Sequence, residues 1–279
     1  MTGTHPQAPI AGVAMTAIGV AVIRARESDR PDRLYDDPLA RVFADAAARS
    51  FDPARWERLE ALADQFYEGR SVGVRLVDDS VRAALAAGCR HIVLIGAGLD
   101  TRAFRMEWPE GVRLFEIDLP ELFAFKEPVL AQAGAAPRCE RRVIAADLRA
   151  DWPKELVANG FRFEEPAHWI DEGVLGYLDE DARGVVEKIT EIAAPGSRFG
   201  FGRFAVDTDS APYVELRRMV SGDAAPPRSP GGLGPDAEQW LTDIGWSTEF
   251  HSWDDLVAPY GRPVAVNDPR IGTIRAIRR

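Results

Sequence analysis

Short apolar runs alternate with longer mixed segments through the middle of the chain. Strands are expected where β-branched and aromatic residues cluster, because such runs suit buried strands. Helices are expected where apolar positions recur with helical spacing between turn residues. The predicted strands are 91–95, 112–117, 142–145, 168–171 and 197–204, and the predicted helices are 72–87, 120–132 and 179–193. This alternation predicts a parallel, doubly wound α/β sheet.

The C-terminal part of the chain follows a different pattern. Residues 224–235 (AAPPRSPGGLGP) contain four prolines and three glycines, which predicts a loop. We expect this loop to border the entrance for a substrate. After it come predicted helices at 235–244 and 254–258 and predicted strands at 246–252 and 272–277. Neither an internal repeat nor a long linker divides the sequence, so we expect one domain over residues 1–279.

Composition narrows the function classes. The chain has 279 residues and a net charge of −10, which argues against nucleic-acid binding and is compatible with a cationic ligand. Cys89 and Cys139 form no CxxC pair, and the four histidines share no metal-ligand spacing, so no disulfide and no metal are expected. Residues 8–23 lack charge but have no basic leader, which favours a buried or lid-forming helix over an export signal or membrane span. A cytoplasmic protein is expected.

A glycine turn follows the first predicted strand. Gly96, Ala97 and Gly98 stand between strand and helix, where the lack of a Cβ lets a ligand approach the backbone. The third glycine of the dinucleotide fingerprint is missing, because Thr101 occupies its position. A turn made only for packing remains an alternative.

Carboxylates end the next two strands. Asp118, 22 residues after Gly96, can accept both hydroxyls of a ribose, or it can cap the helix that follows. Asp147 can accept an adenine amino group while Leu148 packs on the ring, or it can cap a turn before Arg149. An acid at each strand end, together with the incomplete fingerprint, favours S-adenosylmethionine (SAM) over NAD.

Glu172 follows the fourth strand, beside the topological switch point where ligands bind. Its carboxylate is a candidate partner for the SAM ammonium or for the acceptor, whereas its neighbour Asp171 is expected to point the other way. Tyr177 is a candidate for the acceptor pocket or for the core. Arg75 or Arg70 could hold the SAM carboxylate, or could lie on a solvated helix face.

These residues belong to stretches with a recognisable pattern. The sequence resembles the leucine carboxyl methyltransferase-like family, in particular its bacterial branch of SAM-dependent O-methyltransferases. The stretches that carry the resemblance are RPDRLYDDP at 30–38, IGAGLDTR at 95–102, FEID at 115–118, ADL at 146–148, WIDEGVLGY at 169–177 and YGRP at 260–263.

The resemblance implies a class I SAM-dependent methyltransferase fold, which is a Rossmann-like, seven-stranded sheet with an antiparallel last strand. It also implies an N-terminal helical lid over residues 1–70 and a SAM-binding sheet over 71–279. The cofactor contacts that it implies are Arg75, Gly96, Ala97, Gly98, Asp118, Leu119, Asp147, Leu148 and Glu172.

Two departures from the family pattern concern the acceptor pocket. The usual pair of arginines flanking a threonine reads Gly73-Val74-Arg75, and Gly176 stands where a large residue is usual. Both changes would widen or reshape the pocket.

The expected reaction is methyl transfer to an oxygen of a small molecule by a monomer or homodimer. A carboxylate acceptor is ionised at neutral pH and needs no general base, whereas a phenol is protonated at neutral pH and requires one. His168 is the one candidate base at a strand end, and this shortage of bases favours a carboxylate. The alternatives are a phenol or hydroxyl acceptor, a protein carboxyl group, an NAD-dependent oxidoreductase and a non-catalytic SAM-binding protein.

Overall fold

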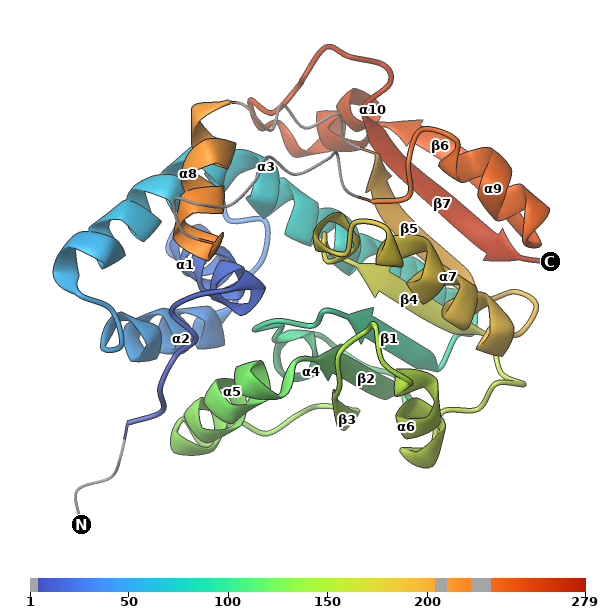
Figure 1. Ribbon diagram of the computed structural model, residues 1–279, viewed down its shortest axis with the longest axis horizontal. Coiled ribbons are helices and arrows are strands. Elements are labelled where there is room, and N and C mark those ends of the chain that lie inside the picture. The colour runs from blue at the N-terminus through green and yellow to red at the C-terminus, as the bar shows by residue number, and fades with distance from the viewer. Residues whose placement is uncertain (1–4, 204–209, 222–231) are drawn as a thin grey trace.

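The computed structural model describes residues 5–203, 210–221 and 232–279. Within these residues seven strands form one sheet in the order β3-β2-β1-β4-β5-β7-β6 (Figure 1). Strand β7 runs antiparallel to both of its neighbours, and the other pairs are parallel. The strands are β1 (His91–Ile95), β2 (Arg113–Asp118), β3 (Glu140–Ala145), β4 (Ala167–Asp171), β5 (Arg198–Arg203), β6 (Trp246–Ser252) and β7 (Gly272–Arg278).

Helices cover both faces of the sheet, because successive residues of its buried strands point to opposite sides. On one face, Ile92, Leu94 and Ile170 pack in a core with α1 (Thr16–Ser28), α2 (Pro38–Ala48), α3 (Pro53–Ala86) and α5 (Pro120–Gln132). On the other face, Val93 and Trp169 pack with α6 (Trp152–Ala158), α7 (Asp181–Ile192) and α9 (Ala237–Asp243). The remaining helices are α4 (Arg102–Arg105), α8 (Ala211–Ser221) and α10 (Trp253–Val257).

The N-terminal helices have clear start signals. The Asp37 side chain accepts a hydrogen bond from the Ala40 amide at the start of α2, and Asp52 accepts one from Arg55 at the start of α3. A proline occupies the first turn of each helix, where its missing N–H costs nothing. Helix α3 then continues for 34 residues, about 50 Å, along the sheet (Figure 1).

The predicted fold class is confirmed, including the antiparallel last strand. The predicted helix at 72–87 was too short, because α3 begins at Pro53 and the boundary set at residue 70 falls inside it. Helices α6 and α8 were not predicted, and α2 was expected only as part of a helical region over residues 1–70, without bounds of its own. Most of the predicted loop at 224–235, and residue 204 at the end of the predicted strand 197–204, lie outside the described residues.

No helix within the described ranges combines the length and the apolar character needed to cross a membrane. In the same ranges, no group of three or more histidine, cysteine, aspartate or glutamate side chains could hold a metal ion.

Candidate active site

A cavity of about 450 Å³ lies at the carboxyl ends of β1, β2 and β3. Its wall includes the glycine turn after β1 and the residues that follow β2, β3 and β4, and helix α1 contributes Thr16, Ala17 and Val20. Cavities of roughly 300 to 1,000 Å³ hold small ligands and cofactors. The predicted residues on this wall are Gly96, Ala97, Gly98, Asp118, Leu119, Asp147, Leu148, Glu172 and Tyr177.

The glycine turn has a backbone that other residues rarely adopt. Gly96 and Gly98 have φ angles of 66° and 51°. A Cβ built on Gly96 would lie 2.5 Å from the Cβ of Val174, and one on Gly98 would lie 3.2 Å from the Cβ of Ala17. Glycine is therefore required at position 96 both by the conformation and by the packing of the loop after β4.

Asp118 is held firmly at the end of β2. Its Oδ2 accepts a hydrogen bond from the Gly98 amide at 2.6 Å, and its Oδ1 accepts one from the Leu119 amide at 2.7 Å. Burial raises the pKa of Asp118, while these two backbone donors act in the opposite direction. The carboxylate thus ties the first strand end to the second, and its remaining lone pairs border the cavity.

Asp147 caps the turn before Arg149 and also lines the smaller cavity. Its carboxylate lies on the cavity wall, and it also accepts hydrogen bonds from the backbone and the guanidinium of Arg149, at 2.9 and 2.7 Å respectively. The hydrogen bonds from Arg149 lower the pKa of Asp147. Leu148, which is 5% exposed, lines the same cavity.

Glu172 lies where two cavities meet, and its carboxylate is ion-paired with Arg102. Its neighbour Asp171 turns back into the loop, where its Oδ1 accepts hydrogen bonds from the amides of Gly173 and Leu175 at 3.0 and 3.2 Å. Burial raises the pKa of Asp171 to about 6. The expectation that one member of the pair is structural agrees with this arrangement.

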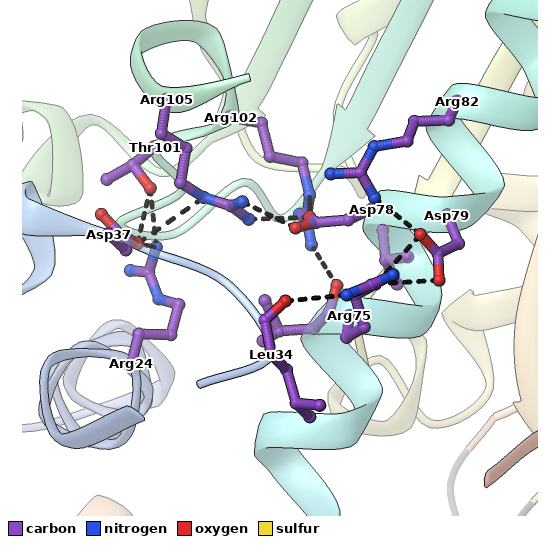
Figure 2. Close-up of polar contacts among 12 residues, drawn as sticks. Arg24, Leu34, Asp37, Arg75, Asp78, Asp79, Arg82, Thr101, Arg102 and Arg105 are labelled. Atoms are coloured by element: carbon purple, nitrogen blue, oxygen red, sulfur yellow. Dashed lines mark hydrogen bonds and ion pairs between the residues drawn. The ribbon is translucent and has the colours of Figure 1, made fainter. Parts of the chain in front are cut away.

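A buried ionic network lies beside the segment that follows the glycine turn (Figure 2). Asp78 of α3 accepts hydrogen bonds from Arg102 at 2.7 Å and from Arg105 at 2.6 and 2.7 Å. Asp37, which caps α2, accepts hydrogen bonds from Arg24 and from the Thr101 hydroxyl, each at 2.7 Å. Burial alone would raise the pKa of Asp78, but the two arginines outweigh it and lower the pKa. The network joins α1, the start of α2 and α3 to the segment that follows the glycine turn.

Arg75 is the one predicted cofactor contact that lines neither cavity. Its guanidinium donates hydrogen bonds to Asp79, at 2.9 and 3.0 Å, and to the Leu34 carbonyl at 2.9 Å (Figure 2). Arg70 instead lines both cavities, and its guanidinium lies 3.4 Å from the Glu172 carbonyl oxygen. Five residues along a helix rotate a side chain by about 140°, so the two arginines point to different surfaces.

A second cavity of about 1370 Å³ adjoins the first. It extends between α3, α8, strands β4, β5 and β7, and the segment around α10. The polar residues that line both cavities are Arg70, Glu172, Tyr177 and Tyr213. Tyr213 of α8 packs its ring at 5.1 Å from that of Phe66 on α3. The sequence contains no motif that marks Tyr213, because only the docking of α8 on α3 brings it here.

Comparison with known proteins identifies the family of this chain. The leucine carboxyl methyltransferase family matches residues 17–189. The chain belongs to this family. A relative from Parafrankia sp. strain EAN1pec, named as a "putative S-adenosyl-L-methionine-dependent methyltransferase", is 40% identical over 94% of this chain and 86% of its own. A relative from Streptomyces coelicolor with the same description is 39% identical over the full length of both chains.

Solved structures agree in fold. A protein from Thermobifida fusca, described as a "putative methyltransferase", matches with a TM-score of 0.51 and 20% identity, covering 96% of this chain and 95% of that one. A DUF574 family protein from Streptomyces avermitilis matches with a TM-score of 0.57 and 18% identity, covering 95% and 96%. The predictions of the family and of SAM as its cofactor are confirmed.

Proposed function

We propose that this chain transfers the methyl group of SAM to an oxygen of a small-molecule carboxylic acid. Membership of the leucine carboxyl methyltransferase family supports methyl transfer with SAM. The choice of a carboxylate rests on the side chains at the junction of the two cavities.

The smaller cavity suits SAM in size and in its polar groups. Asp118 would take the ribose hydroxyls, Asp147 the adenine amino group and Leu148 the ring face. Arg70, which replaces Arg75 in this proposal, would hold the carboxylate of SAM, and Glu172 would lie near its ammonium. When bound, SAM supplies an electrophilic methyl group on its sulfonium.

The observation that carries the carboxylate proposal is the lack of a base at the junction. Among the described residues that line both cavities there is neither histidine nor lysine. His168, the candidate base named from the sequence, lines only the larger cavity, and its Nε2 lies 3.1 Å from the Ser80 hydroxyl. Burial raises the pKa of Tyr213, so its hydroxyl keeps its proton and acts as a donor. Glu172 is already paired with Arg102. A phenol, with a reference pKa of about 10, needs a base here, whereas a carboxylate arrives ionised.

A cation is available for the acceptor on the same surface. Arg217 follows Tyr213 by one helical turn on α8, and both line the larger cavity. Within the described part of the chain, no carboxylate lies within ion-pair distance of the Arg217 guanidinium. Arg217 and the Tyr213 hydroxyl would orient the acceptor carboxylate, and most of the rate would come from this positioning.

The test is formation of S-adenosylhomocysteine with panels of carboxylic acids and of phenols. Acids are expected to turn over and phenols are not. Arg217→Gln should raise the KM for the acid at least tenfold, since a hydrogen bond to a charged group is worth roughly 1.5 to 3 kcal/mol. It should leave the KM for SAM unchanged. The exposed neighbour Arg218 supplies the matched control, Arg218→Gln, with wild-type kinetics. Turnover of phenols in preference to acids would refute the proposal.

A further inference from the structure

The larger cavity is lined by a glycine from a helix and a glycine from a strand, and glycine is unfavourable inside both kinds of element. Gly73 lies inside α3, where glycine costs roughly 1 kcal/mol relative to alanine, and Gly200 lies inside β5, where it removes a packing side chain. Neither has a positive φ, and a Cβ built on either would meet no atom within 4 Å. Backbone conformation and protein packing therefore leave both glycines unexplained.

The strand register shows where the open space leads. Gly200 pairs with Ile170 of β4 on one side and with Arg275 of β7 on the other, and Arg275 pairs with Glu249 of β6. All four residues line the larger cavity. Since neighbouring strands are about 4.8 Å apart, this row crosses the sheet over roughly 14 Å. Its inner end, Ile170, is two residues from Glu172 at the junction with the smaller cavity.

The inner wall also contains a buried polar atom without a partner. His168, two residues before Ile170 on the same face of β4, is 6% exposed and lines the larger cavity. Its Nε2 lies 3.1 Å from the Ser80 hydroxyl of α3, whereas its Nδ1 has no hydrogen-bond partner. Such a buried atom is uncommon in native proteins, and a bound ligand can supply its partner.

We propose that this row is the floor of an acceptor channel, and that the acceptor is an elongated carboxylic acid whose apolar body crosses the sheet over Gly200 and under Gly73. The inference rests on the proposed carboxyl methylation. The cavity of about 1370 Å³ exceeds the roughly 300 to 1,000 Å³ that small ligands occupy. Val77, one turn after Gly73, and Ile170 supply apolar contacts, and the exposed Arg275 stands at the outer end.

The test compares butanoate, octanoate and dodecanoate as acceptors and as ligands. Burial of each further methylene should raise kcat/KM about fourfold until the acid reaches the outer end of the row. Affinities are measured by calorimetry with S-adenosylhomocysteine present, so that binding is read independently of methyl transfer.

Two variants fill the channel from opposite walls. Gly200→Val, which suits a strand, and Gly73→Leu, which suits a helix, should each reduce the preference for dodecanoate over butanoate at least tenfold, while SAM affinity changes less than twofold. Gly184→Leu is the matched control, because Gly184 is also a helical glycine with open space at its Cβ but lines neither cavity. It should retain the full preference.

The outcomes separate this inference from the proposed function. Tight dodecanoate binding that both variants abolish, without methyl transfer to any acid, would support the channel and refute carboxyl methylation. Methyl transfer or binding that is independent of chain length, absence of binding by every acid, or a length preference that survives in both variants would overturn the channel.

Discussion

The substitution Asp78→Asn tests how much the buried ionic network between α3 and the segment after the glycine turn contributes to stability. The Asp78 side chain is fully buried, and its two partners, Arg102 and Arg105, are 1% and 7% exposed (Figure 2). Asparagine keeps the shape of the side chain but removes the negative charge between two guanidinium groups. The arginines would then remain buried with only part of their counter-charge, from Asp100, Glu172 and Asp37.

Removing one partner of a buried ion pair costs about 3 to 5 kcal/mol, because the desolvated charge that remains is no longer compensated. For a chain of 279 residues, such a loss corresponds to a decrease in Tm of roughly 5 to 9 °C. The assay is thermal and urea unfolding followed by circular dichroism, on the protein without ligand.

Asp64→Asn provides the control on the same helix. Asp64 pairs with Arg26 at 2.5 Å, but its side chain is 69% exposed, and pairs of this kind contribute at most about 1 kcal/mol. A decrease in Tm for Asp78→Asn no larger than that for Asp64→Asn would refute the reasoning, since it would mean that the buried arginines tolerate the loss of their carboxylate.

Three further predictions concern the cofactor turn, the nucleoside site and pH. Gly96→Ala should lower Tm and abolish SAM binding. Its control is Gly88→Ala, because Gly88 also has a positive φ but has open space at its Cβ, so this variant should lose only about 1 to 2 kcal/mol of stability through backbone strain. Equal losses of stability for the two variants in unfolding experiments would contradict this. Asp118→Asn should weaken SAM binding at least tenfold by calorimetry, and unchanged affinity would exclude the assigned role. Burial lowers the pKa of His168 from 6.5 to about 4, so the unfolded chain binds a proton first as pH falls through this window. Stability should therefore decrease by about 3 kcal/mol between pH 6.5 and 4, and His168→Gln should flatten that decrease; parallel pH profiles of Tm would exclude the effect.

Much of the fold and of the cofactor wall could be predicted from local sequence patterns. The strand that ends at Ile95, the glycine turn, the acid that ends β2 and the acid that follows β3 are each visible in a short stretch of sequence. Parallel strands bring their carboxyl ends to one edge of a sheet. Asp118 and Asp147 therefore meet at one cavity whatever the details of side-chain packing.

Contacts between distant segments depend on helix phase and on sheet order, which such patterns leave open. Arg70 and Arg75 look equivalent along the chain, yet only the rotation of α3 against the sheet directs Arg70 into the cavities. Tyr213 reaches the junction because α8 docks on α3. Gly200 forms part of a channel floor because β7 inserts between β5 and β6, a pairing between residues more than 70 positions apart. Each of these features arises from long-range packing, in which the burial of many apolar side chains selects one arrangement of the elements.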